Sequence, residues 1–173
     1  MTPQLQDLYF AAGCFWGAER YFRLLDGVVE TEVGYANGRT AQPTYEQVYT
    51  DTTGFAETVH VRFDPAITPA GELVRLFLRA IDPTSVNQQG EDRGTRYRTG
   101  VYYTDEQFLP AIRAELDRCQ ESLGQPLAVE CEPLQNFYRA EEYHQDYLTK
   151  NPTGYCHLSP ALFAFAKSYK GRR

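Results

Sequence analysis

The sequence has no long apolar run, no excess of positive charge and no closely spaced pair of cysteines. Nowhere do about 18 consecutive apolar residues occur, which is roughly the length that a membrane-spanning helix needs. The opening residues 1–7 lack the basic, apolar and small-residue pattern of a secretory signal. The formal net charge is −6, whereas nucleic acids and anionic membranes attract concentrated positive charge. We therefore expect a soluble, cytoplasmic protein that binds neither nucleic acid nor membrane.

Four cysteines are present, and they lie far apart at Cys14, Cys119, Cys131 and Cys156. None belongs to a C-x-x-C pair, and their spacings differ from those of structural zinc sites. A chain of 173 residues is long enough to bury a substantial core, so it has little need of stabilising disulfides. We therefore expect reactive thiols rather than zinc ligands or stabilising disulfides.

Two of these cysteines fit ordinary core positions. Cys119 continues an apolar helical stripe formed by Ile112 and Leu116. Cys131 shares one face of an expected strand with Val129, because strand side chains alternate. We expect both thiols to be structural, which leaves Cys14 and Cys156 as candidates for chemistry.

Strand and helix patterns alternate along the chain. Strands are expected at residues 8–12, 28–35, 57–63, 97–103 and 128–132, and helices at 15–25, 69–81, 104–123 and 139–150. Residues 151–173 contain Pro152, Gly154 and Pro160 and are expected to be irregular. The pattern predicts one α+β domain over residues 1–173, with a mixed sheet, helices packed on it as a two-layer α/β sandwich, a ferredoxin-like core and a long irregular C-terminal tail.

Cys14 follows Gly13 at the point where the first strand gives way to the first helix. The unpaired N–H groups and the positive dipole end of a helix favour a thiolate, which is the nucleophilic form of cysteine. A buried structural cysteine fits the same local pattern, since cysteines are often buried. The local pattern alone leaves both interpretations open.

Glu57 lies on the apolar face of its expected strand, together with Val59, Val61 and Phe63. A carboxylate in such a position requires a reason, because burying a charge is costly. Desolvation raises the pKa of a carboxyl group, so Glu57 can stay protonated near neutral pH and donate a proton. The pattern indicates a general acid.

The residues around Cys14 resemble a known family. Residues 13–17 read G-C-F-W-G, similar to the signature of the A-type methionine sulfoxide reductases. The resemblance continues through residues 34–35, 43–46, 56–59, 87–94, 97–98, 143–145 and 151–156. It covers most of the chain, from about residue 8 to residue 156.

The resemblance implies an enzyme that reduces methionine S-sulfoxide, free or in proteins, to methionine and so repairs oxidative damage. Cys14 would attack the sulfoxide sulfur, which is a poor electrophile until the negative charge developing on its oxygen is stabilised. By resemblance, Glu57 is the acid that protonates this oxygen. Tyr45 and Tyr97 match tyrosines whose hydroxyls hold the same oxygen, and Asp92 matches a carboxylate that helps to bind substrate and order the site.

Phe15 and Trp16 would form an apolar wall for the methyl group on sulfur, so that the pocket distinguishes the two sulfoxide epimers. Oxygen transfer would leave Cys14 as a sulfenic acid, with which a second thiol condenses. Cys156 matches the cysteine of the family's G-Y-C motif, and an irregular tail can bring it within the roughly 4.4–6.8 Å between Cα atoms that a disulfide requires. The resemblance implies that thioredoxin then reduces this disulfide, with no metal or organic cofactor.

Two positions depart from the family pattern. Family members often carry a second recycling cysteine after the G-Y-C motif, whereas no cysteine follows Cys156 here. Phe55 stands where many members have histidine. We expect a monomer in which the disulfide of Cys156 is reduced directly.

Two other functions compete with this interpretation. A papain-like cysteine hydrolase would pair Cys14 with His144, although it needs neither a desolvated glutamate nor a thiol in the tail. A non-catalytic module could instead bind methylated cations in an aromatic cage that includes Trp16. The residues alone assign no role to His60 or His144.

Overall fold

The computed structural model describes residues 4–172 of the chain. Within these residues the main sheet has six strands in the order β7-β6-β1-β3-β2-β8. Its central part follows the chain order β1 (Gln6–Ala12), α1 (Phe15–Leu24), β2 (Val28–Ala36), β3 (Ala56–Phe63), α3 (Ala70–Arg79) and β6 (Thr99–Tyr103). This β-α-β-β-α-β succession, with β6-β1-β3-β2 side by side, is a ferredoxin-like core. The predicted α+β fold is confirmed.

The remaining elements extend this core at its edges. They are α2 (Tyr45–Tyr49), β4 (Gln88–Gln89), β5 (Asp92–Arg93), α4 (Leu109–Leu123), β7 (Glu130–Pro133), β8 (Phe137–Arg139), α5 (Tyr147–Lys150) and α6 (Pro160–Ser168), with short 3-10 turns at Thr95–Tyr97, Glu106–Phe108 and Glu142–His144. Strand β7 runs parallel to β6, whereas the other pairs in the main sheet are antiparallel. No helix among the described residues is both long and apolar enough to cross a membrane.

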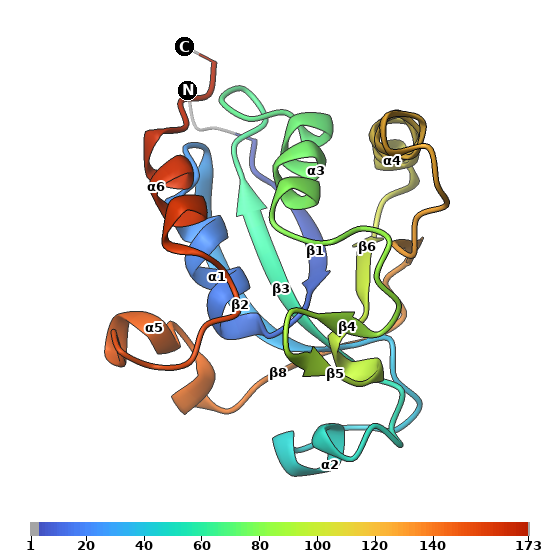
Figure 1. Ribbon diagram of the computed structural model, residues 1–173, viewed down its shortest axis with the longest axis vertical. Coiled ribbons are helices and arrows are strands. Elements are labelled where there is room, and N and C mark those ends of the chain that lie inside the picture. Colours follow the sequence, from blue (N-terminus) through green and yellow to red (C-terminus); the bar gives the residue numbers. More distant parts are fainter. Residues whose placement is uncertain (1–3, 173) are drawn as a thin grey trace.

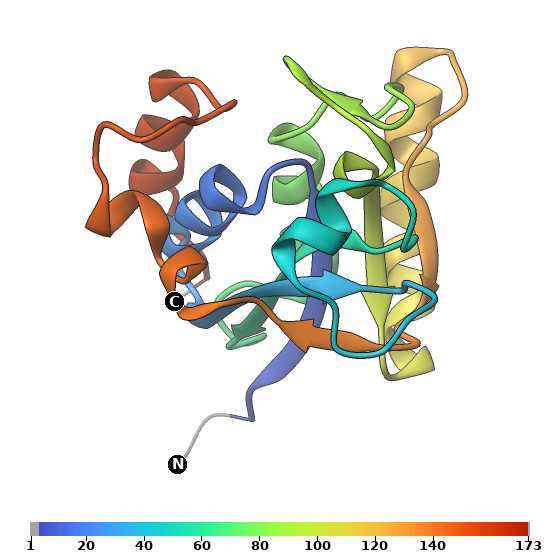
Figure 2. The same ribbon diagram turned by 90° about the horizontal axis from the view of Figure 1, so that it is seen from below.

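Helices α1 and α3 cover one face of the sheet, with α6 beside α1 (Figures 1 and 2). Phe10 of β1 lies on this face, and its ring centroid is 4.9 Å from that of Phe22 in α1 and 5.0 Å from that of Phe77 in α3. Val59 of β3 pairs with Phe10 and is fully buried. Because alternate residues of a strand share a face, Glu57 also lies on the helix side, as the sequence predicts.

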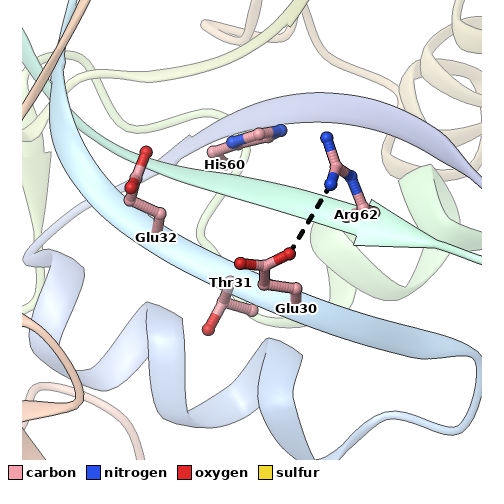
Figure 3. A pocket seen from close by; sticks show the side chains of 5 residues that line it. All are labelled: Glu30, Thr31, Glu32, His60 and Arg62. Atoms are coloured by element: carbon pink, nitrogen blue, oxygen red, sulfur yellow. Dashed lines mark ion pairs between the residues drawn. The ribbon is translucent and has the colours of Figure 1, made fainter.

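The opposite face of the sheet carries a small buried apolar cluster of Ala11, Ala36, Ala56 and Tyr102, and its remaining part is polar. His60 stacks on Tyr9 with ring centroids 4.4 Å apart, and its Nε2 lies 2.7 Å from Oδ1 of Asp7. A shallow pocket on this side is lined by Glu30, Thr31, Glu32, His60 and Arg62 (Figure 3). The side chain of Thr31 points away from the other four, toward α1. The pocket is part of an ordinary solvated sheet face.

The tail differs from the prediction that it is irregular, because residues 160–168 form α6. Ser159 caps this helix by accepting a hydrogen bond from the N–H of Leu162 at 3.2 Å, and Pro160 occupies the first helical turn. A serine followed by proline is a helix-start signal, although proline alone suggests a break. The guanidinium of Arg79 lies 3.8 Å from the ring centroid of Phe165, which attaches α6 to α3.

The predicted helix over residues 139–150 is also wrong. Strand β8 ends at Arg139, and α5 begins only at Tyr147. Between them, Asp146 adopts a left-handed backbone with φ 52°, which a continuous helix does not allow. Its N–H donates to Oε1 of Glu19 at 2.6 Å, so a tertiary contact determines the break.

Glu19 generates a prediction about stability. Its carboxylate is 2% exposed and also accepts a hydrogen bond from the hydroxyl of Thr31 at 2.8 Å, so it joins α1 to β2 and to the turn before α5. We expect Glu19→Ala to lower the free energy of unfolding by about 1–3 kcal/mol, because two donors lose their acceptor. Urea denaturation measures this, with the exposed Glu121→Ala in α4 as a control that changes stability by less than about 0.5 kcal/mol.

Candidate active site

Cys14 lies at the junction between β1 and α1, where it is the N-cap residue of the helix. Its side chain is only 6% exposed. Gly13 makes the turn before it with φ 79°, and a Cβ at Gly13 would lie 2.9 Å from Cβ of Gln89. Both the backbone angle and the close approach require glycine here. The predicted location of Cys14 at a helix N-terminus is confirmed.

Glu57 approaches the same helix start from β3. Its Oε1 accepts a hydrogen bond from the N–H of Phe15 at 3.1 Å, and the side chain is 2% exposed. Burial raises the pKa of Glu57 to about 8, while the N–H of Phe15 and the charge of Arg96 act in the opposite direction. At neutral pH this carboxyl group therefore holds a proton, as the sequence predicts for a general acid.

The thiol of Cys14 is not activated in the way the helix position suggests. Burial raises its pKa well above the usual value, and the nearby charge of Glu57 raises it further, while a hydrogen bond from the N–H of Trp16 acts in the opposite direction. Desolvation thus outweighs the helix N-terminus, and the resting thiol is protonated. This corrects the expectation of a resting thiolate.

An aromatic cluster borders the start of α1. The ring of Trp16 stacks on Tyr147 with centroids 3.8 Å apart, and its Nε1 donates to Nδ1 of His144 at 2.9 Å. The His144 ring lies 5.2 Å from that of Phe15 and 4.5 Å from that of Tyr45. His144 is fully buried, and within the described chain its Nε2 has no hydrogen-bond partner. Phe15 and Trp16 thus lie in an apolar wall held by His144.

Tyr45 and Tyr97 lie on short elements beside Glu57. Tyr45 begins α2, where its N–H donates to Oε2 of Glu141 at 2.9 Å. Tyr97 ends a 3-10 turn, and the guanidinium of Arg96 lies 4.3 Å from its ring centroid. Burial raises the pKa of both hydroxyls and the charge of Glu57 raises it further, so both phenols remain hydrogen-bond donors.

Asp92 of β5 connects this region to the C-terminal tail. Its Oδ1 accepts a hydrogen bond from the hydroxyl of Tyr155 at 2.8 Å. Its Oδ2 is buried and has no hydrogen-bond partner among the described residues. The negative charge of Asp92 adds to the burial that raises the pKa of Cys14, Glu57 and Cys156.

Cys156 packs against the first turn of α1. A Cβ built on Gly17 would lie 2.8 Å from Sγ of Cys156, so only glycine lets the tail approach this closely. Gly17 follows Cys14 by about one helical turn, so Cys156 contacts the helix at whose start Cys14 lies. In the described part of the chain all four cysteines are free thiols.

The structure brings the predicted site residues together at one end of the sheet: Cys14, Phe15, Trp16, Tyr45, Glu57, Asp92, Tyr97 and Cys156. Cys119 and Cys131 lie elsewhere, half-buried on α4 and β7 at the edge of the core. The sequence assigns no role to His144, although it lies in the matching stretch 143–145, and it does not point to Tyr147. Phe55 is buried and packs edge-on against Tyr138.

These groups define a class of protein. A thiol beside a protonated carboxyl can accept an oxygen atom while the carboxyl protonates it, and a second thiol that packs against the same helix can close a disulfide. Among the described residues, no group of three or more His, Cys, Asp or Glu side chains is placed to hold a metal ion. The fold and the site together define a thiol-dependent oxidoreductase.

Comparison with known proteins identifies the family. Residues 6–171 match the family model for peptide methionine sulfoxide reductase, and the chain belongs to this family. A peptide methionine sulfoxide reductase MsrA from Lachnoclostridium phytofermentans is 53% identical over 163 residues, covering 94% of this chain and 98% of the relative. One from Clostridium acetobutylicum is 50% identical over 158 residues, covering 91% and 98%.

Solved structures agree with this assignment. Mxr1 from Saccharomyces cerevisiae in reduced form has a TM-score of 0.85 at 38% identity, covering 90% of this chain and 91% of that one. The same yeast protein in complex with the thioredoxin Trx2 has a TM-score of 0.59 at 28% identity, covering 83% and 84%. The predicted A-type family and the predicted enzyme class, a peptide-methionine (S)-S-oxide reductase, are confirmed.

The protonated resting thiol can be tested by alkylation. In a Cys119→Ser, Cys131→Ser, Cys156→Ser background, we expect iodoacetamide to modify Cys14 slowly at pH 7, with a rate that keeps rising with pH beyond the range in which an ordinary thiol is already ionised. Adding Glu57→Gln should move this rise to lower pH, because it removes a negative charge that raises the pKa. Mass spectrometry measures the modification, and fast labelling at pH 7 would contradict the assignment.

Proposed function

We propose that this enzyme reduces the S epimer of methionine sulfoxide, both free and in proteins, to methionine and so repairs oxidative damage. One observation carries the proposal: the buried carboxyl of Glu57 is hydrogen-bonded to the first N–H of the helix that Cys14 caps. This contact fixes an acid beside a nucleophile. A sulfoxide presents a sulfur to attack and an oxygen to protonate, so it needs both groups side by side.

In the first step, the sulfoxide oxygen accepts hydrogen bonds from Tyr45 and Tyr97 and a proton from Glu57. Phe15 and Trp16 enclose the methyl group, so only one epimer directs its oxygen toward the donors. Proton transfer gives the sulfoxide sulfur a positive charge. This charge stabilises the thiolate form of Cys14, which the resting site does not stabilise. Cys14 then passes its own proton to the carboxylate of Glu57 and attacks the sulfur, so the S–O bond of the substrate breaks as the oxygen moves to Cys14 and Glu57 is protonated again. The products are methionine and the sulfenic acid of Cys14.

In the second step, Cys156 attacks the sulfenic sulfur of Cys14. The S–O bond breaks, water leaves, and a Cys14–Cys156 disulfide forms. The packing of Cys156 on Gly17 supports this pairing over one with Cys119 or Cys131, which lie on α4 and β7. No cysteine follows Cys156 to take over the disulfide.

A dithiol protein then returns the enzyme to its reduced form by thiol–disulfide exchange. Thioredoxin is the proposed reductant, and the yeast relative in complex with a thioredoxin supports it. Neither step requires a metal or organic cofactor. A cytoplasmic location, a monomeric state and the absence of nucleic-acid and membrane partners stay predictions from the sequence.

The geometry disfavours the hydrolase alternative. A papain-like site needs a histidine that takes the proton of the cysteine. In this structure Nδ1 of His144 is occupied by the indole N–H of Trp16, and burial lowers the pKa of its ring. The aromatic-cage alternative does not explain why a buried acid lies beside a thiol, because binding a methylated cation requires neither group.

Single-turnover reduction tests the proposed function. Without external thiol, we expect the wild-type protein to form one equivalent of methionine from methionine S-sulfoxide and none from the R epimer, leaving a Cys14–Cys156 disulfide. Cys14→Ser should form none, because the nucleophile is lost. Cys156→Ser should form one equivalent but not be recycled by thioredoxin. Methionine quantification and disulfide mapping measure this, and multiple turnovers by Cys156→Ser would move the resolving role to another cysteine.

The role of Glu57 as the acid predicts a pH profile. The single-turnover rate of the wild type should fall as the pH rises through about 8, because the proton donor is then ionised. Glu57→Gln should slow the step about 10²–10⁴-fold and remove this decline. Rapid-quench measurement at saturating sulfoxide tests it, with Glu46→Gln in α2, an exposed neighbour, as the control. A Glu57→Gln profile equal to that of the wild type would exclude the acid role.

A further inference from the structure

His157 follows Cys156 directly and is folded onto the start of α1. Its Nε2 lies 3.2 Å from the carbonyl oxygen of Ala12. A carbonyl oxygen only accepts hydrogen bonds, so Nε2 carries the proton and Nδ1 is left with its lone pair. Nδ1 is buried, and no described residue offers it a hydrogen bond. Such an unsatisfied buried acceptor requires an explanation.

Nδ1 of His157 and Sγ of Cys156 lie against the same point of α1. A Cβ built on Gly17 would be 3.4 Å from Nδ1 and 2.8 Å from Sγ, so both atoms border the same point of the helix. Cys14 begins the same helical turn. The vacant acceptor of His157 therefore lies at the helical turn that carries Cys14 and contacts Cys156, the two residues that the proposed function joins.

The resolving thiol lacks a group that takes its proton. Burial raises the pKa of Cys156, and the charge of Asp92 on β5 raises it further, while the N–H of Leu158 and the charge of Arg20 on α1 act in the opposite direction. The same Asp92 faces His157, whose pKa is nevertheless lowered by burial. At neutral pH the imidazole is therefore an uncharged base beside a protonated thiol.

We propose that His157 is the general base that accepts the proton of Cys156 when this thiol attacks the sulfenic acid of Cys14. The inference rests on the proposed function, because the sulfenic acid is its intermediate. The S–H bond of Cys156 breaks and its proton moves to Nδ1, while the new S–S bond forms. The S–O bond of Cys14 breaks, and the departing hydroxide takes the proton from Nδ1 as water. Cys156 is oxidised, Cys14 is reduced, and the imidazole returns to its neutral form.

The test compares the wild type with His157→Gln. Glutamine can donate to the Ala12 carbonyl through its amide nitrogen but has no basic group, so it preserves the anchor and removes the base. Sulfenic acid is generated on Cys14 in two separate ways in a Cys119→Ser, Cys131→Ser background, with methionine S-sulfoxide and with hydrogen peroxide at a concentration high enough that oxidation of Cys14 does not limit the rate of disulfide formation. Methionine release and the appearance of the Cys14–Cys156 disulfide are followed in the same rapid-quench samples by mass spectrometry.

We expect His157→Gln to release methionine at the wild-type rate but to form the disulfide at least about tenfold more slowly at pH 7. Its disulfide rate should rise steadily up to and beyond about pH 9 as the thiol ionises by itself, whereas the wild-type rate should level off near neutral pH. His157→Asn serves as a second variant and is expected to behave in the same way. It also replaces His157→Gln if circular dichroism shows the latter to be unfolded.

Two results would overturn the inference. One is a disulfide rate in His157→Gln equal to that of the wild type. The other is a slower rate with an unchanged pH profile, which would mean that His157 only anchors the tail. If the wild type releases no methionine from the sulfoxide, the proposed function is wrong. The experiment in which hydrogen peroxide forms the sulfenic acid still tests the role of His157 in that case.

Discussion

The hydrogen bond from the N–H of Phe15 to Glu57 is the contact on which the site depends. It joins the middle strand of the ferredoxin-like core to the helix that Cys14 begins, so sheet and helix together fix the distance between acid and thiol. The bond lies in the core, where an unpaired carboxyl would be costly. The same burial that makes the bond necessary keeps Glu57 protonated, because desolvation disfavours the charged form. Burial of Glu57 therefore explains both its hydrogen bond to the start of α1 and its protonated state.

This arrangement also keeps the thiol unreactive at rest. Desolvation raises the pKa of Cys14, and the charge that Glu57 carries once it ionises above about pH 8 raises it further, so the helix N-terminus alone does not produce a thiolate. Under the proposed function, reactivity appears only when a sulfoxide oxygen takes the proton of Glu57 and leaves a positive sulfur against Cys14. A protonated thiol oxidises slowly, because the thiolate is the reactive form. An enzyme that acts on oxidised substrates thus protects its own nucleophile between turnovers.

The sequence predicted what depends on local patterns. Alternation along β3 placed Glu57 on the buried face, and a glycine before an apolar helical stripe placed Cys14 at a helix start. It did not predict properties set by tertiary packing. The pKa of Cys14 depends on how deeply the helix start is buried, and the break at Asp146 depends on the carboxylate of Glu19, 127 residues away. The sequence assigned His144 no role, because its hydrogen bond with Trp16 joins residues 128 positions apart.

The tail shows how packing gives a motif its function. Helix α6 lies beside α1, where the guanidinium of Arg20 is 5.4 Å from the ring centroid of Phe163, and this contact brings the preceding segment back over the first turn of α1. Gly17 then admits the sulfur of Cys156, and Gly13 admits the imidazole of His157. Since a side chain on either glycine would push the segment away, the two glycines allow a resolving thiol and a base to share one helix turn with Cys14. The same close packing half-buries the free thiol of Cys156, so the segment that presents this thiol is held against α1 in the reduced protein.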